Sequence, residues 1–335
     1  MAYTMKEVAK RAGVSPATVS RVLNKTRYIS AETEKRVLQV VQELQYFKNI
    51  HARRLSTGQS DLLGLVISEI ANPYFPEIIR GFQAAAWDRD LDVLLCNTEY
   101  SPSRTASIIH KLVRSDVRGV AIMTTALGNG QTDELIGAGI GLVSCNLRPT
   151  GKLVSNISIH YARGILQAIE HVAALGHRDA AVIAGPQANR TATRIQRALV
   201  KALHHQGLTP FPVIRADYRV DAGAAAVGAI LSAPRMPTVI FCGSDLIAMG
   251  AMSALEAAGL RIPEDVSIIG IDDIAFACLA SPPLTTIRIP RERLGTLAFE
   301  ALDRMLKLKR RQGANYRLET DLIVRQSTGP AKRCG

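Results

Sequence analysis

The sequence predicts an α/β protein with a small all-helical unit at its N-terminus and two doubly wound parallel sheets in the larger remainder. Two observations lead to this prediction. The first sixty residues carry only helical spacings of apolar residues, whereas from Leu62 onward short apolar runs alternate with amphipathic helical patterns. Continuous buried strands that alternate with helices are typical of parallel sheets. A chain of 335 residues is also too long for one ordinary hydrophobic core and suits two or three domains.

The larger part contains several short apolar runs that we expect to be strands. They lie at 63–67, 93–96, 120–123, 142–145, 181–184, 239–242 and 266–271. Amphipathic patterns between them predict helices, for example at 75–89, 165–175, 198–205, 222–231 and 246–258. In such folds a ligand binds between two sheets, at the carboxyl ends of the strands.

The composition is that of an ordinary soluble globular protein, with 47% hydrophobic and 21% charged residues. No apolar run approaches the ~18 residues of a membrane span, and no basic segment followed by an apolar stretch opens the chain. We therefore expect a cytoplasmic protein without a membrane partner. Five scattered cysteines form no C-x-x-C pair, and we expect four of them to be buried reduced thiols, namely Cys96, Cys145, Cys242 and Cys278.

Positive charge is concentrated at the N-terminus. The net charge is +12, and residues 1–60 hold eleven Lys or Arg against four Asp or Glu, which gives +7 in that segment. A small basic unit of this kind is the electrostatic footprint of a nucleic-acid binder.

The basic unit carries the start and stop signals of helices. Thr4 and Glu7 have the spacing of a capping box, and Gly13 can end the first helix in a left-handed conformation. Ser15 is a good N-cap, and Pro16 suits the first position of a second helix that runs to about Asn24.

Apolar spacing indicates which faces of these helices are buried. In the first helix the apolar positions are Met5, Val8, Ala9 and Ala12, and in the second they are Val19, Val22 and Leu23. A third helix is expected to start after Ser30 and to run to about Tyr46, with an apolar stripe of Val37, Leu38, Val41 and Leu44.

A helix, a glycine turn and a short second helix form the helix-turn-helix plan. Small residues near the start of the second helix would let it enter the major groove. Arg21 could then contact guanine O6 and N7, which is worth roughly 1–3 kcal/mol of base discrimination. A phosphate contact or a solvent-exposed arginine is the alternative. Phosphates would be held by Lys6, Lys10, Lys25 and Arg27.

Residues 13–24, GVSPATVSRVLN, resemble the N-terminal signature of the LacI-type repressor family. Tyr46 and the segment 49–55 resemble that family's tyrosine and hinge, although Phe47-Lys48 stands where the family usually has a proline. The resemblance implies a homodimeric repressor of a palindromic operator in double-stranded DNA. It also implies a DNA-binding domain over 1–49 and a hinge helix or linker over 50–60, in which Leu55 wedges into a base step.

Motif and resemblance together give a set of expected DNA contacts. They are Thr4, Ser15, Pro16, Ala17, Thr18, Ser20, Arg21, Asn24, Lys25, Tyr28, Asn49, His51, Ala52, Arg53 and Leu55. From the residues alone, a plain basic linker is the alternative interpretation of the hinge.

Landmarks similar to the same family continue along the chain, at 72–75, 171–178, 184–186, 245–251, 270–273 and 282–287. They resemble its effector-binding and dimerisation domain, which is itself similar to periplasmic sugar-binding proteins. The resemblance implies that this domain covers 61–330. It would have two subdomains, formed by 61–160 plus 290–318 and by 161–289 plus 319–328, so that the chain crosses between them three times.

The expected effector pocket departs from the family pattern. Asn146-Leu147 stands where an Asp-Arg pair is common, His160-Tyr161 replaces an Asp-Asn pair, and an ungapped count puts the family's gripping arginine at Ile195. The effector contacts we expect are Tyr74, Phe75, Asn146, His160, Arg190, Arg194, Tyr218, Ser244 and Asp272. Aromatic faces and a carboxylate suit a sugar or sugar derivative, and the cationic residues would allow a sugar phosphate, a sugar acid or another anion.

Little in the sequence supports catalysis. It has no G-x-x-x-x-G-K-[ST] loop and no His/Cys cluster with metal-ligand spacing, so we expect neither an enzyme nor a cofactor or metal. Two further interpretations compete with an effector-controlled regulator. One is a constitutive repressor with a degenerate pocket, and the other is a stand-alone small-molecule binding protein.

Overall fold

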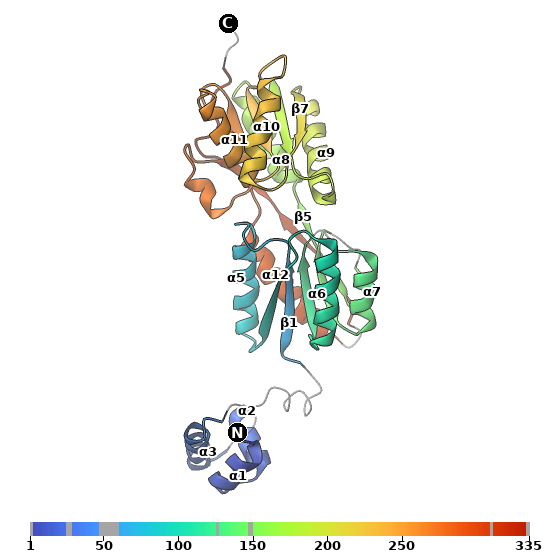
Figure 1. Cartoon of the computed structure of the whole chain (residues 1–335), viewed down its shortest axis with the longest axis vertical. Coiled ribbons are helices and arrows are strands. Elements are labelled where there is room, and N and C mark those ends of the chain that lie inside the picture. The colour runs from blue at the N-terminus through green and yellow to red at the C-terminus, as the bar shows by residue number, and fades with distance from the viewer. Residues whose placement is uncertain are drawn as a thin grey trace. The chain divides into compact units, whose positions relative to one another are not determined.

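The computed structural model describes residues 3–24, 29–46, 60–124, 127–146, 150–308 and 311–332. They belong to two compact units, one within Met1–Ser60 and one within Asp61–Gly335, and Figure 1 shows the elements of each. Within these described ranges, no helix has the length and apolarity needed to cross a membrane.

The described residues of the N-terminal unit form three helices, which begin where the signals predict, although the third ends at Glu43 and not near Tyr46. They are α1 (Met5–Ala12), α2 (Pro16–Asn24) and α3 (Ala31–Glu43). The capping box is present, because Thr4 Oγ1 accepts from the Glu7 amide at 3.4 Å while the Glu7 carboxylate accepts from the Thr4 amide at 2.6 Å. Gly13 ends α1 with a φ of 65°. Ser15 caps α2, since its Oγ accepts from the Thr18 amide at 3.1 Å.

The helices of this unit enclose one small apolar core. Val8, Val19 and Val37, one from each helix, are fully buried at its centre, and Tyr46 packs into it beyond the end of α3. The prediction that Leu38 belongs to the buried stripe was wrong, because that side chain is 46% exposed. Its neighbours Val37 and Val40 face the core instead, which leaves Leu38 on the solvent face of the helix.

The second unit contains two six-stranded sheets, which confirms the predicted α/β fold. In the first sheet all neighbouring strands are parallel, in the order β11-β5-β4-β3-β1-β2. These strands are β1 (Leu62–Ile67), β2 (Asp92–Asn97), β3 (Gly119–Met123), β4 (Gly141–Cys145), β5 (Val154–His160) and β11 (Asn315–Glu319). The helices of this subdomain are α5 (Phe75–Trp87), α6 (Pro102–Arg114), α7 (Asn129–Gly137) and α12 (Arg291–Lys307).

The second sheet has the order β12-β10-β9-β8-β6-β7. Its strands are β6 (Asp179–Ala184), β7 (Thr209–Arg215), β8 (Val239–Cys242), β9 (Ser267–Asp272), β10 (Thr285–Arg288) and β12 (Asp321–Ile323). The helices of this subdomain are α8 (Ala162–Ala174), α9 (Arg190–His205), α10 (Val220–Leu231), α11 (Asp245–Ala257) and the 3₁₀-helix η1 (Ala275–Cys278). Edge strand β12 pairs antiparallel with β10. This sheet is therefore mixed, whereas the sequence predicted a wholly parallel one.

The chain passes between the two sheets after β5, after β10 and between β11 and β12, so three segments connect the subdomains. Figure 1 shows these connections between the lower and upper sheets of the unit. In each sheet the strand order reverses at the strand that comes first in the chain, β1 in the first sheet and β6 in the second, because both neighbours of that strand follow it in the sequence. Ligands bind at such switch points, outside the carboxyl ends of the strands.

Helices α5 and α12 pack backbone to backbone. A Cβ atom on Gly81 would lie 2.1 Å from the Glu292 carbonyl oxygen, and one on Gly295 would lie 2.0 Å from the Ile78 carbonyl oxygen. Only glycine permits this approach. The backbones of the two helices are therefore in close contact at these positions.

The cysteines differ partly from expectation. All four described cysteines are free thiols, but only Cys242 is fully buried, while Cys96 and Cys145 are half-buried and Cys278 is exposed. Cys278 ends η1 with its side chain at the surface, while its neighbour Ala277 faces the core.

Candidate DNA-binding surface and effector cavity

The start of α2 is the exposed surface of the N-terminal unit that the helix-turn-helix motif would present to DNA. Ser15, Pro16, Ala17 and Arg21 are exposed, whereas Thr18 and Ser20 are half-buried. Thr18 Oγ1 lies 2.9 Å from Ser15 Oγ, so two short polar side chains close the N-terminus of this helix. Thr4 is exposed at the start of α1.

Several expected DNA contacts lie outside the described residues. They are Lys25, Tyr28, Asn49, His51, Ala52, Arg53 and Leu55, together with the side chain of Asn24. Their roles stay predictions.

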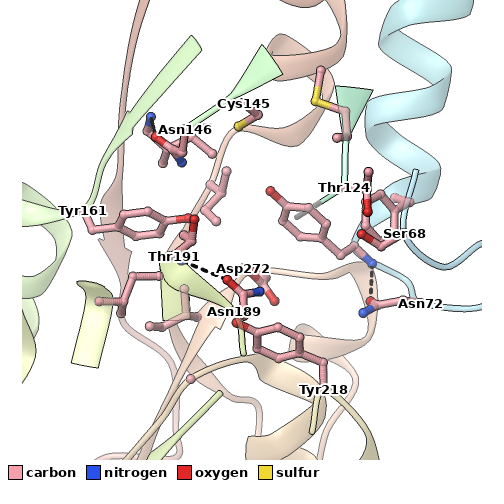
Figure 2. A pocket seen from close by; sticks show the side chains of 18 of the residues that line it. Ser68, Asn72, Thr124, Cys145, Asn146, Tyr161, Asn189, Thr191, Tyr218 and Asp272 are labelled. Carbon is pink, nitrogen blue, oxygen red and sulfur yellow. Dashed lines mark hydrogen bonds between the residues drawn. The ribbon is translucent and has the colours of Figure 1, made fainter. Parts of the chain in front are cut away.

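A cavity of about 110 Å³ lies between the two subdomains of the larger unit, at the carboxyl ends of strands from both sheets (Figure 2). The first subdomain contributes residues that follow β1, β3 and β4, and the second contributes residues that follow β6, β7, β8 and β9. The lining is Ser68, Asn72, Tyr74, Phe75, Tyr100, Met123, Thr124, Cys145, Asn146, Ile159, Tyr161, Asn189, Thr191, Ile195, Tyr218, Gly243, Ile271, Asp272 and Ile289.

Aromatic rings form much of the cavity wall. Tyr74 and Phe75 meet edge to face, with their ring centroids 5.1 Å apart. Gly185 makes room for Tyr218, because a Cβ atom there would lie 2.6 Å from the tyrosine hydroxyl. Burial raises the pKa of Tyr74, Tyr161 and Tyr218, so their hydroxyl groups are protonated at neutral pH. Such walls stack on flat rings, and their hydroxyl groups also form hydrogen bonds.

Asp272 is the acidic residue among the described residues that line the cavity. It ends β9 with a φ of 123°, and Figure 2 shows it facing the same space as Tyr161 and Tyr218. Burial raises the pKa of Asp272 well above its usual value, the neighbouring Asp245 carboxylate raises it further, and Arg291 partly offsets both effects. No hydrogen bond to its carboxyl group comes from the described residues, so a bound molecule can be its partner.

Arg291 holds the backbone beside Asp272. Its side chain is only 2% exposed, and its guanidinium donates to the carbonyl oxygens of Asp272 and Asp273 and to Glu77 Oε1 at 2.6 Å. Because Glu77 lies in the first turn of α5 and Asp272 ends β9, this one side chain joins the two subdomains beside the cavity.

The structure brings five of the nine expected effector residues to the cavity: Tyr74, Phe75, Asn146, Tyr218 and Asp272. The other four, His160, Arg190, Arg194 and Ser244, are not among its described lining residues. Ser244 is buried and caps α11 through the Ile247 amide, while Arg190 and Arg194 are exposed on α9. The cationic residues that suggested an anionic effector therefore do not line the cavity.

Sequence reasoning missed several polar lining residues, above all Asn72, Asn189 and Thr191. Asn189 caps α9, which begins at Arg190 and not near Ala198 as expected. The signal that could have found it is an asparagine just after Gly185-Pro186, at a helix N-terminus. In the described part of the chain, no group of three or more His, Cys, Asp or Glu residues is arranged to hold a metal ion.

Comparisons with known proteins agree with this arrangement. A family described as bacterial regulatory proteins, lacI family, matches residues 4–49, and a periplasmic binding protein-like domain matches residues 169–328. The HTH-type transcriptional repressor PurR of Pasteurella multocida (strain Pm70) is 35% identical over 327 residues, which cover 97% of this chain and 98% of that protein.

Two solved structures are similar over nearly the whole chain. The lac repressor dimer bound to operator and the anti-inducer ONPF has a TM-score of 0.88 at 27% identity, covering 98% of this chain and 100% of that one. The complex of the transcriptional regulator CelR with cellobiose has a TM-score of 0.72 at 29% identity, covering 97% and 99%. The chain therefore belongs to the lacI family of bacterial regulatory proteins and is a DNA-binding transcriptional repressor, not an enzyme.

Proposed function

We propose that this repressor binds a palindromic operator as a homodimer in the cytoplasm, and that a small polar effector in the cavity between its subdomains controls its DNA affinity. The observation that carries the proposal is the cavity itself, whose polar and aromatic lining comes from both subdomains. A molecule that touches both walls prefers one degree of closure. Such a molecule can shift the equilibrium between two degrees of closure by no more than the difference between its binding free energies for them.

The lining supports an effector of the sugar class or a similar polar ring. Stacking faces such as Tyr74 and Tyr218 are combined with hydroxyl, amide and carboxyl groups. The similar CelR structure contains cellobiose. A degenerate, effector-free pocket would be filled by apolar side chains, whereas this one keeps about 110 Å³ and at least six polar side chains: Ser68, Asn72, Thr124, Asn146, Asn189 and Thr191.

The DNA-binding part of the proposal uses residues 1–49, with Arg21 in base contact and 50–60 as the hinge in which Leu55 enters the minor groove. Arg21 is exposed on α2, the helix that the motif would place in the major groove. The remaining domain, 61–330, would bind the effector and dimerise.

Exposed apolar side chains support dimerisation through the larger unit. Trp87 of α5 is 84% exposed and Ile70 is 53% exposed, and in the other subdomain Leu279 is 76% exposed beside Phe276. Ile70 and Trp87 line one groove along α5, and large exposed apolar side chains are typical of surfaces that another molecule covers. A second copy of this chain is the occupant we propose, because the similar lac repressor structure is a dimer.

The test begins with a thermal-shift screen of the full-length protein against sugars, sugar phosphates, sugar acids and nucleobases. A ligand at 100 times its Kd should stabilise the protein by roughly 2.7 kcal/mol. A hit is then added to a titration of operator DNA, selected from random sequence, at one fixed salt concentration. A change in operator affinity supports the proposal. Operator binding with no hit, or with a hit that leaves the affinity unchanged, would instead favour a constitutive repressor.

A further inference from the structure

Three asparagines line the cavity, and each has its side-chain oxygen already engaged. Asn72 Oδ1 accepts from the Tyr74 amide at 2.9 Å, and Asn146 Oδ1 accepts from the Ile159 amide at 2.9 Å. Asn189 Oδ1 accepts from the Thr191 and Ala192 amides at 2.9 and 3.1 Å, as the cap of α9. Figure 2 marks the bonds of Asn72 and Asn189.

These bonds fix the orientation of each amide group. A backbone N–H can only donate, so the atom that faces it must be the oxygen, and the NH₂ group must face the other way. The Asn72 amide is also engaged by Tyr100. For Asn146 and Asn189, no described residue accepts from the NH₂ group. Because both residues line the cavity, we expect a bound molecule to meet these two amide donors, one from each subdomain.

Asp272 adds a carboxyl group to the cavity wall. Its carboxyl group is close to Asp245 and has no hydrogen-bond donor among the described residues. None of the described lining residues is Lys, Arg or His. The positive charge of Arg194 lowers the pKa of Cys145 and of Tyr161, which burial raises. The Arg194 side chain is nevertheless exposed and is not among the described lining residues.

We infer that the cavity selects an uncharged effector with acceptor atoms facing Asn146 and Asn189 and a hydroxyl or N–H group facing Asp272, and that it discriminates against phosphorylated or acidic forms of the same compound. This inference rests on the proposed effector site and names its ligand class. An anion would lie beside an acidic group in a space that no described Lys, Arg or His lines and where water screens charge poorly. The nearby Arg291 is already paired with Glu77 and with the backbone carbonyl of Asp272.

Asn189 permits a sharp test, because its two functions can be separated. In Asn189→Asp, one oxygen can keep both backbone bonds, since aspartate is as good an N-cap as asparagine, while the donor that faces the cavity becomes an acceptor. Asn189→Ser also keeps a capping oxygen but removes the amide NH₂ donor, which the shorter hydroxyl group cannot replace at the same position, and it adds no charge. Both variants should fold and bind the neutral ligand about tenfold or more weakly.

Asn97 provides the matched control. Its Oδ1 also accepts from a backbone amide, that of Ile70 at 3.2 Å, but it lies at the end of β2 and is not among the cavity-lining residues. Asn97→Asp makes the same chemical change elsewhere and should leave the Kd of the ligand unchanged. A loss in Asn189→Asp without a loss in Asn189→Ser would be a charge effect and would overturn the donor role.

Matched ligand pairs test the charge selection directly by calorimetry on the full-length protein. The probes are ribose and ribose 5-phosphate, cellobiose and cellobionic acid, and adenosine and its 5′-monophosphate. We expect at least one neutral member to bind, with its anionic partner about tenfold or more weaker. Equal or tighter binding of the anionic partner would overturn the inference and leave the effector site standing. No binding by any member, with operator binding intact, would refute both the effector site and this inference.

Discussion

Replacing Arg291 by methionine should destabilise the larger unit more than any exposed ion pair can. The change leaves the Glu77 carboxylate and the carbonyl oxygens of Asp272 and Asp273 without their shared donor. Removing one partner of a buried ion pair costs roughly 3–5 kcal/mol. Glu77 is 33% exposed, so water will solvate part of its charge, and we take the lower end of this range, about 3 kcal/mol. Methionine retains most of the stem, which keeps the packing loss small.

The same pair of helices provides a matched control. Arg80 on α5 contacts Glu292 on α12 at 2.6 Å, but the two side chains are 65% and 55% exposed. Arg80→Met should therefore cost about 0–1 kcal/mol. By thermal unfolding, Arg291→Met should lower the Tm by about 6–12 °C and Arg80→Met by at most about 4 °C. If Arg291→Met lowers the Tm no more than Arg80→Met does, the buried side chain does not hold the subdomains together.

Three further predictions concern the DNA surface, the dimer and the cavity. Arg21→Ala should weaken binding to the selected operator more than to random DNA in gel-shift titrations at one salt concentration, and an equal loss on both would leave only a phosphate contact. Trp87→Glu should shift the protein toward monomer in analytical ultracentrifugation, because a charge would be buried in the proposed interface, and an unchanged dimer would place that interface elsewhere. The pKa of Asp272 is raised by burial and by Asp245. The free energy of unfolding therefore falls as the pH rises above about 3.9, the pKa of an aspartate in the unfolded chain. Asp272→Asn should therefore raise the Tm at pH 8 more than at pH 5, and an equal gain at both values would contradict a raised pKa.

The fold could be predicted where local chemistry decides it. The capping box at Thr4 and Glu7, the turn at Gly13 and the cap at Ser15 are short-range signals, and the structure reproduces each one. Strands that are continuously apolar, such as β8, were also found. Strand β5 was not, because VSNISIH mixes polar and apolar residues, and its polar Asn156 and Ser158 are satisfied by Asn315 of distant β11.

The cavity was harder to predict because its lining depends on where helices begin. Asn146 and Asp272 follow recognisable strands, and both reach it. Arg190 and Arg194 are four residues apart and therefore share one face of α9, whereas Ile195 is turned inward to the cavity. The donors at Asn146 and Asn189 depend on backbone amides whose positions only the folded chain fixes.

Helix α5 connects three features that sequence spacing alone would treat as separate. Tyr74 and Phe75 at its start line the cavity, Glu77 binds buried Arg291, and Trp87 ends it as an exposed aromatic residue. A helix of 13 residues spans about 20 Å, and the glycine contacts with α12 leave it no room to bend against its partner. We therefore expect a displacement at the cavity to move α5 as a unit, including its Trp87 end. Since an effector acts only through its preference for one arrangement, we expect the two states of the repressor to differ at the surface around Trp87, where we propose that a second copy binds. An effector that fills the cavity without moving α5 should bind and leave operator affinity unchanged.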